Sequence, residues 1–136
     1  VLDLFSGTGS FGLECISRRS KNVIFIENYS KAIRILKENI EKLKVENKCD
    51  IIERDVFKIF DKEPFLNKKF DLIFLDPPYK EENINDLLKT IKTKKILKEN
   101  GVIVVHRHKK DNEKLIDSLK ILDERIYGIS KLIIGS

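Results

Sequence analysis

The feature that most constrains the fold is the alternation of short apolar runs with segments of helical period. Seven runs are typical of strands, at residues 1–5, 23–27, 49–53, 70–75, 102–106, 121–127 and 132–135. Several are apolar at almost every position, as strands are when helices cover both faces of a parallel sheet. The sequence therefore predicts an α/β fold with a doubly wound, mostly parallel sheet of seven strands.

The segments between the strands predict helices with one buried face. Residues 10–19 should form a helix with Ser10 as its N-cap, and residues 30–44 a second. Two further stripes are Ile84, Leu87, Leu88 and Ile91, and a shorter one of Leu115, Ile116 and Leu119. In the second helix the buried stripe should be Ile33, Leu36, Ile40 and Leu43.

Turn signals complete the predicted topology. Asn100-Gly101 predicts a turn just before the fifth strand. The last two strands have only a short segment around Gly128 between them, so they should pair as an antiparallel hairpin. Residues 55–69 predict one helical turn and a loop.

Composition limits the class of protein. With 136 residues, of which 41% are hydrophobic, the chain should form one domain around one core. Its apolar runs are shorter than about ten residues, against the roughly twenty of a membrane helix, so we expect a soluble, cytoplasmic protein without a membrane partner. Cys15 and Cys49 lack the spacing of a zinc site and should be small core residues. No metal is expected.

The beginning and the charge of the chain carry further expectations. The sequence has no Met, and Val1 lies inside a strand-like run, which predicts that an N-terminal segment is missing. A net charge of +5 permits an anionic partner without establishing one.

A glycine-rich loop follows the first predicted strand. Gly7, Gly9 and Gly12 satisfy the pattern GxGxxG, and Glu27 ends the second strand. Such a loop lets a ligand approach backbone N–H groups, while the carboxylate accepts hydrogen bonds from ribose hydroxyls. A dinucleotide and S-adenosylmethionine both fit this arrangement.

Two other acids bear on that choice. Asp3 lies in the strand that leads into the loop, where its charge favours the ammonium and sulfonium of adenosylmethionine over a pyrophosphate. Asp55 follows the third strand, where it can accept from an adenine amine. Each has a structural alternative, because Asp3 can bond loop amides and Asp55 can cap a helix.

The most specific motif ends the fourth strand as Asp76-Pro77-Pro78-Tyr79. Consecutive prolines fix an extended loop whose carbonyls should lack local donors. An exocyclic amine of a nucleobase can donate to the Asp76 carboxylate and the Pro77 carbonyl, while Tyr79 offers a ring for stacking. These residues predict a site that orients an amine.

Together, DLFSGTGSFGLECISR, FIEN, RDVF and DLIFLDPPY resemble the RsmD-type family of class I Rossmann-like methyltransferases, which methylate guanine N2 in small-subunit (16S) ribosomal RNA. The resemblance covers nearly the whole chain. It implies a single S-adenosyl-L-methionine-dependent methyltransferase domain over residues 1–136 and, as partner, ribosomal RNA or the assembling small subunit. We expect it to act as a monomer.

The same resemblance assigns roles to individual residues. It implies amine handling at Asp76, Pro77, Pro78 and Tyr79. It implies cofactor contacts at Asp3, Phe5, Gly7, Gly9, Glu27, Asn28, Asp55 and Val56. Two departures are the absent segment upstream of the first strand and His106-Arg107-His108, where an acid is more usual.

Other functions remain open at this point. A DNA adenine-N6 or protein glutamine-N5 methyltransferase also uses a Pro-Pro-aromatic tetrad, the latter usually after Asn. A nicotinamide-dependent dehydrogenase explains the glycine loop and Glu27 but not the tetrad, and an RNA-binding scaffold explains only the charge. Arg18, Arg19, Lys21, Arg107, Lys109 and Lys110 are candidate phosphate contacts, with solvated surface as the alternative.

Overall fold

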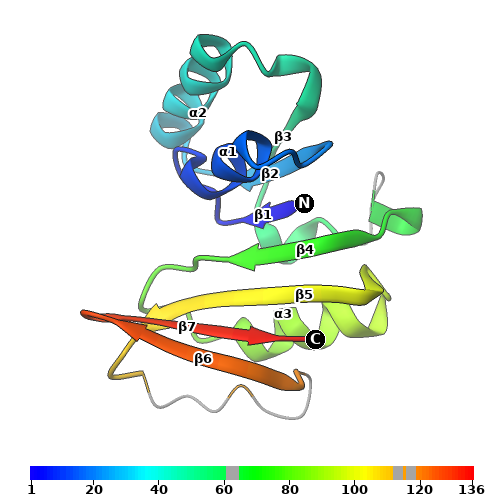
Figure 1. Cartoon of the computed structure of the whole chain (residues 1–136), viewed down its shortest axis with the longest axis vertical. Helices are drawn as coiled ribbons and strands as arrows, with labels where there is room; N and C mark the ends of the chain where they lie inside the picture. Colours follow the sequence, from blue (N-terminus) through cyan, green and yellow to red (C-terminus); the bar gives the residue numbers. More distant parts are fainter. Residues whose placement is uncertain (61–64, 112–114, 116–118) are drawn as a thin grey trace. The chain divides into compact units, whose positions relative to one another are not determined.

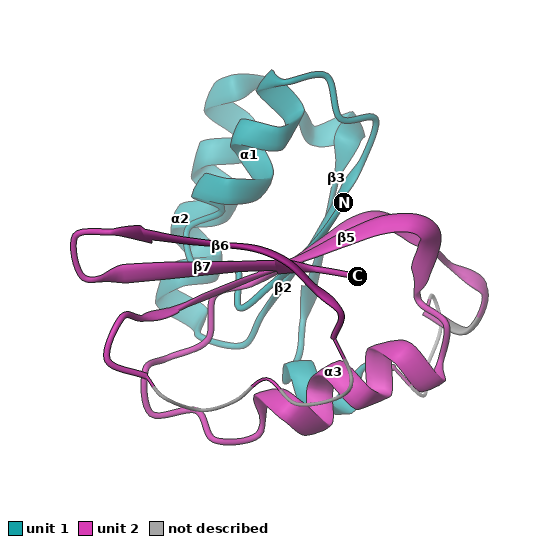
Figure 2. Cartoon of the chain, turned by 60° about the horizontal axis from the view of Figure 1, so that its bottom comes forward, with its two compact units in different colours: residues 1–59 teal, residues 60–136 magenta. Residues whose placement is uncertain are grey.

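The computed structural model describes residues 1–60, 65–111, 115 and 119–136 (Figure 1). The chain divides into two compact units, Val1–Ile59 and Phe60–Ser136, which Figure 2 colours teal and magenta.

The N-terminal unit alternates strands with helices, and its strands run parallel in the order β3-β2-β1. Its elements are β1 (Leu2–Leu4), α1 (Ser10–Ser17), β2 (Val23–Glu27), α2 (Ser30–Leu43), the 3-10 turn η1 (Glu46–Lys48), β3 (Cys49–Glu53) and the 3-10 turn η2 (Val56–Lys58). The register pairs Glu27 with Glu53, so β2 and β3 end at the same edge. The strands predicted at residues 23–27 and 49–53 are confirmed.

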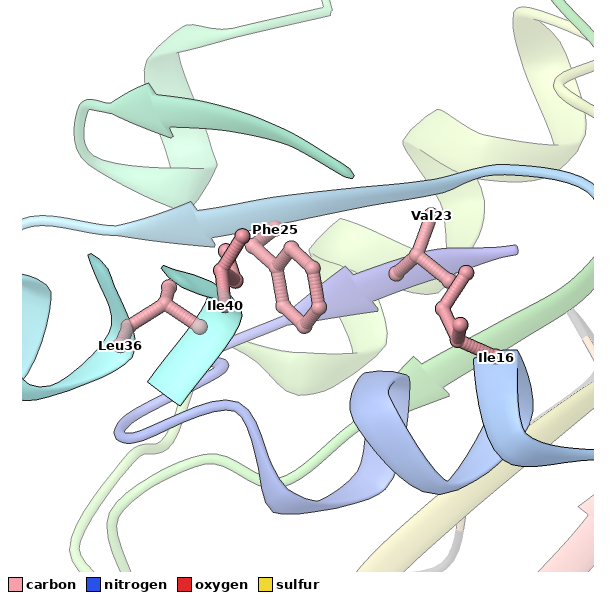
Figure 3. Packing of buried hydrophobic residues seen from close by; sticks show 5 residues of the cluster. All are labelled: Ile16, Val23, Phe25, Leu36 and Ile40. Carbon is pink, nitrogen blue, oxygen red and sulfur yellow. The ribbon is translucent and has the colours of Figure 1, made fainter. Parts of the chain in front are cut away.

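Apolar side chains from both helices and from β2 form the core of this unit. Figure 3 shows the cluster, which consists of Ile16, Val23, Phe25, Leu36 and Ile40. Three of the four residues predicted for the α2 stripe are buried. The fourth, Leu43, is 57% exposed because the helix ends there and Lys44 turns the backbone to a left-handed φ of 55°.

The start of α1 differs from the prediction. Gly9, and not Ser10, is the N-cap, with a left-handed φ of 85° and no side-chain cap. This conformation is strained for a residue with a Cβ, and it lets the chain turn from the loop into the helix without a capping hydroxyl.

The two cysteines lie against the core cluster, partly buried, as predicted for small core residues. Burial, reinforced by the negative charge of Asp3, raises the pKa of the Cys15 thiol. Burial together with the charge of Asp50 raises the pKa of the Cys49 thiol. Both thiols are therefore poor nucleophiles at neutral pH.

The C-terminal unit combines parallel and antiparallel strands in the order β4-β5-β7-β6. Its elements are the 3-10 turn η3 (Phe65–Asn67), β4 (Phe70–Leu75), α3 (Ile84–Thr93), β5 (Leu97–His108), β6 (Ile121–Tyr127) and β7 (Ser130–Gly135). β4 and β5 are parallel, and β7 is antiparallel to both β5 and β6. The closing hairpin is therefore confirmed.

The turn at Asn100-Gly101 is wrong as a boundary, because β5 begins at Leu97 and the residues lie in an irregular stretch where its register with β4 shifts. The short helix predicted from Leu115, Ile116 and Leu119 falls mostly outside the described residues. The stripe predicted for α3 is correct, and all four of its residues are buried.

Among the described strands, β6 pairs with β7 alone and forms the edge of this unit's sheet. It exposes both apolar and charged side chains, among them Ile126 and Tyr127 toward the hairpin turn. Arg125 donates through Nε to the Asp123 carboxylate at 2.8 Å, so opposite charges share one face of the edge.

No helix in the described part of the chain combines the length and the apolar character needed to cross a membrane.

Candidate functional site

The glycine loop leaves β1 through a strained backbone. Phe5 has a φ of 60°, which is unusual for an aromatic residue, and Gly7 and Gly9 also have positive φ. A Cβ on Gly7 would meet nothing within 4 Å, whereas one on Gly9 would lie 2.3 Å from Leu36. The first glycine thus leaves space beside the loop, and the second lets the loop lie close to α2.

The third glycine of the pattern has a packing role. A Cβ on Gly12 would lie 2.3 Å from the ring of Phe25, which is fully buried on β2. Its backbone N–H donates to the Asp3 carboxylate at 3.0 Å. Gly12 therefore fixes the approach of α1 to the sheet, as the third glycine of such loops does.

Asp3 is 1% exposed, which makes it one of the two buried charged residues within the described ranges. Its position on β1, paired with Phe25, places the carboxylate below the first turn of α1. A buried carboxylate is retained when positive partners or N–H groups stabilise its charge. The structural alternative foreseen for Asp3, a bond to backbone amides, is present through Gly12.

Glu27 ends β2 with a half-buried carboxylate that gathers three backbone N–H groups. It accepts from Gly7 at 2.7 Å, from Asn28 at 2.9 Å and from Tyr29 at 2.9 Å. The carboxylate therefore ties the glycine loop to the beginning of α2. A carboxylate has about four acceptor positions, so it can accept a further hydroxyl beside these contacts.

Asp55 adopts the capping role that the sequence left as an alternative. Its Oδ1 accepts from the Phe57 amide at 2.9 Å, and its Oδ2 lies 3.9 Å from Lys58 Nζ. Val56 is 4% exposed, so its side chain belongs to the core. The exposed apolar side chain beside Asp55 is Phe57, which meets Phe5 edge to face at 6.1 Å.

Phe57 was therefore missed by the sequence reasoning, which named Val56. The sequence contained no signal for this choice, because the turn at η2 decides which of the two adjacent apolar residues is buried. The pair Phe5 and Phe57 offers two aromatic surfaces beside the Asp55 carboxylate.

The tetrad directly follows β4, as predicted. One residue of the tetrad, Pro77, is buried and anchors the loop. The other three, Asp76, Pro78 and Tyr79, are exposed to solvent. The expectation that the loop carbonyls lack local donors is wrong for Pro78, whose carbonyl accepts from the Glu81 amide at 2.9 Å. This bond closes a turn immediately after the tetrad.

Three consecutive residues of β5 contact this loop. His106 Nδ1 lies 2.6 Å from Asp76 Oδ1, and the ring of His108 meets Tyr79 edge to face at 5.5 Å. Between them Arg107, 5% exposed, donates to the Glu81 carbonyl at 3.2 Å and forms an ion pair with Asp111. The end of β5 thus holds the loop at three points.

The register of β5 with β4 explains contacts that the sequence alone did not predict. Leu75 pairs with Val105, so the residue after β4 lies beside His106. A sequence read without register cannot place residues 30 positions apart in contact. Arg107, considered as a phosphate contact, is an internal residue, which favours the structural alternative for it.

A hollow of about 660 Å³ opens beside the tetrad, and Tyr79 and His108 are among the residues that line it. Its remaining lining carries charges of both signs, including Lys110 and Glu82. In the described part of the chain, no group of three or more His, Cys, Asp or Glu side chains has an arrangement able to hold a metal ion.

The structure gathers the predicted residues in two sets. The residues predicted to contact the cofactor all belong to the N-terminal unit, around the glycine loop and the ends of β2 and β3. The four predicted to handle the amine belong to the C-terminal unit, after β4.

The chain is similar in sequence to proteins named as ribosomal RNA methyltransferases. A relative described as "Putative rRNA methyltransferase YlbH" from Bacillus subtilis is 32% identical over 95% of this chain and 71% of its own length. "Ribosomal RNA small subunit methyltransferase D" from Buchnera aphidicola is 33% identical over 82% of this chain and 56% of its own length. The chain thus spans between about half and three quarters of these two relatives.

A solved structure of a conserved hypothetical protein from Streptococcus pyogenes superimposes with a TM-score of 0.89 and 35% identity, covering 98% of this chain and 82% of that one. The predicted α/β class with seven strands and a closing hairpin is confirmed. The sequence model of the family described as "Conserved hypothetical protein 95" matches residues 1–136. The chain therefore belongs to this family, the RsmD-type group that its motifs resemble.

Proposed function

We propose that the protein transfers a methyl group from S-adenosylmethionine to the exocyclic N2 amine of a guanine in small-subunit ribosomal RNA. The observation that carries this proposal is the tetrad after β4, where a buried proline anchors the loop and the Asp76 and Tyr79 side chains are exposed. The two relatives described above are named as ribosomal RNA methyltransferases, which supports the same class of substrate.

The N-terminal unit fits adenosylmethionine as cofactor. The space beside Gly7 and the backbone strain at Phe5 suit a ligand lying against the loop. The buried charge of Asp3 suits a cationic ligand, and Glu27 suits a ribose diol. When bound, adenosylmethionine supplies an electrophilic methyl group on a sulfonium.

Aromatic surface and a carboxylate are available for the adenine. Phe57 and Phe5 would contact the faces of the ring, and Asp55 would accept from its amine. This assignment moves the apolar contact from the buried Val56 side chain to Phe57 and leaves Val56 to contribute through its backbone.

In the C-terminal unit, Asp76 and Tyr79 would hold the target base. The guanine N2 lone pair is conjugated with the ring, so the amine is a weak nucleophile. Hydrogen bonds from its two N–H groups to the Asp76 carboxylate and the Pro77 carbonyl favour a pyramidal nitrogen. The lone pair of this nitrogen would then be directed away from the two acceptors and toward the methyl group. Most of the acceleration then comes from positioning and from fixed charges near the developing cation.

The proton leaves last. As N2 becomes cationic, its N–H turns acidic, and the Asp76 carboxylate or water takes the proton after the methyl group has moved. A strong general base is unnecessary for this sequence of events.

Methylation assays with the intact protein test the proposal. Adenosylmethionine labelled in its methyl group is supplied with bare 16S ribosomal RNA, assembled small subunits or duplex DNA. We expect label in RNA, at guanine N2 after nuclease digestion. Label in DNA adenine would replace ribosomal RNA as the substrate, and label in neither would refute the proposed reaction.

A binding measurement tests the cofactor independently. Calorimetry should detect adenosylmethionine and its demethylated product but not NAD, because the Asp3 charge disfavours a pyrophosphate. Tight NAD binding without adenosylmethionine binding would favour the dehydrogenase alternative.

A further inference from the structure

His106 contacts the tetrad but has no role in the proposed chemistry. It lies near the end of β5, and its imidazole Nδ1 is 2.6 Å from Asp76 Oδ1. The Asp76 side chain is 47% exposed, whereas the His106 side chain is only 21% exposed. The less exposed imidazole therefore adjoins a carboxylate that, without this contact, could adopt several side-chain rotamers.

The chemistry of the pair fixes the direction of the hydrogen bond. An ionised carboxylate only accepts hydrogen bonds, so the proton of the contact belongs to His106 Nδ1. The neighbouring His108 is arranged the other way, because its Nδ1 accepts from the Lys110 amide at 3.1 Å. Nδ1 is therefore a donor in His106 and an acceptor in His108, each role being set by the partner of that ring.

We propose that His106 is a positioning residue, which holds Asp76 Oδ1 so that Oδ2 is directed to the amine of the target base. This role rests on the proposed function. The prolines fix the backbone of the loop but not the side-chain torsions of Asp76, and the hydrogen bond from Nδ1 removes that freedom.

Two substitutions of His106 separate positioning from packing. His106→Leu keeps the volume but removes the donor, while His106→Asn places an amide nitrogen near the position of Nδ1 and keeps it. We expect His106→Leu to lower the single-turnover rate of methyl transfer toward the roughly 100-fold loss that misplacement of a reacting group causes. His106→Asn should recover most of the rate, and the affinity for adenosylmethionine should stay unchanged in both.

The same two strands supply a matched control. Lys98 at the start of β5 donates to both Asp71 carboxylate oxygens at 2.9 Å, near the start of β4. Lys98→Leu removes a donor to a carboxylate at the opposite end of this strand pair. Its single-turnover rate should equal that of the parent, which shows that losing a carboxylate contact between β4 and β5 is not in itself damaging.

A spectroscopic measurement tests the contact without any substrate. In nitrogen-15 NMR of the intact protein, His106 should be the Nδ1–H tautomer in the parent and should lose that preference in Asp76→Ala. His108 should remain the Nε2–H tautomer in both. A parent His106 in the Nε2–H form would overturn the proposal whether or not the protein methylates RNA.

The outcomes distinguish this inference from the proposed function. If Asp76→Ala retains the parent's methylation rate, the tetrad is not the reacting site, and both proposals are wrong. If Asp76→Ala abolishes methylation while His106→Leu matches the parent, the proposed function stands and the positioning role is wrong. Equal losses in His106→Leu and His106→Asn would also refute it, because they would show a dependence on the ring and not on the donor.

Discussion

The two units hold their carboxylates by different means. In the N-terminal unit, Asp3, Glu27 and Asp55 all accept from backbone N–H groups. In the C-terminal unit, the Asp76 carboxylate contacts the imidazole of another strand. Backbone donors are present whatever the side chains are, whereas an imidazole can be removed by one substitution. The proposed cofactor site therefore depends on backbone groups that the fold supplies. The proposed amine site depends on one side chain that is distant in sequence.

The comparison extends to the glycines and prolines that shape the two loops. The first loop depends on Gly9 and Gly12, which have no room for a side chain beside Leu36 and Phe25. The tetrad loop instead depends on restricted torsions at Pro77 and on the contacts from β5. Close packing thus determines the shape of the glycine loop, whereas restricted backbone torsions and side-chain contacts from β5 determine that of the tetrad loop.

The largest effect should come from the carboxylate of the tetrad. Asp76→Ala is expected to lower turnover by about 2.7–4 kcal/mol of barrier, if the loss resembles removal of one preorganised catalytic donor. The affinity for adenosylmethionine should remain within a few fold, because the predicted cofactor contacts belong to the other unit. Single-turnover methylation and calorimetry measure the two quantities.

Asp76→Asn sharpens this test. The amide keeps an acceptor oxygen but lacks the charge that opposes the developing cation, so its rate should fall between those of the parent and Asp76→Ala. A rate for Asp76→Asn equal to that of the parent would assign no role to the charge.

Glu27→Ala should have the next largest effect, but on cofactor binding. Each charge-assisted hydrogen bond lost to the ribose should weaken binding by about 1.5–3 kcal/mol. Loss of the three backbone contacts of Glu27 should also lower thermal stability. Glu27→Gln, which keeps an acceptor, is the matched variant for calorimetry. Unchanged cofactor affinity in Glu27→Ala would contradict the ribose assignment.

Gly12→Ala tests the packed character of the first loop. The added methyl group would overlap the buried ring of Phe25, and overpacking of this kind costs about 1–3 kcal/mol. Urea denaturation should show the loss, with Ser17→Ala, an exposed change at the end of the same helix, as the control. Equal stability of the two variants would show that α1 can shift away from β2.

The smallest effect is expected at the other end of the tetrad's strand. Hydrogen bonding from Lys98 lowers the pKa of Asp71 below its ordinary 3.8. A lowered carboxyl pKa contributes stability above about pH 4, and this contribution is lost as the pH falls through the lowered pKa. Because the pair is exposed, Asp71→Asn should change the urea midpoint at pH 7 little, and the difference should vanish in acid. A clear loss at pH 7 would mean that exposed pairs between β4 and β5 matter to the fold.

The sequence predicted the strands well because short, apolar-rich runs alternate with segments of helical period. The runs at 70–75 and 121–127 match β4 and β6 residue by residue. It failed where local signals competed with pairing, as at Asn100-Gly101, which β5 absorbs into a shifted register with β4. It also failed at Ser10, because the left-handed Gly9 starts the helix without a polar cap.

For the candidate site, motifs identified residues adjacent in sequence but not their partners. The tetrad was visible as four consecutive letters. The contact between Asp76 and His106 depends on the register of β4 with β5, which no pattern within either strand reveals. The sequence named Val56 where the structure exposes Phe57 for a similar reason. The turn at η2 decides which of these two adjacent apolar residues enters the core.

The exposed edge strand β6 has a consequence for how the protein behaves in concentrated solution. No described strand pairs with the outer edge of β6, and such an edge is a template for addition of another chain, with apolar surface from Ile126 and Tyr127 next to it. The opposite charges of Asp123 and Arg125 on one face must then be desolvated before a second strand can dock. We expect this charged pair to oppose aggregation, with a larger effect on colloidal stability than on the stability of the fold.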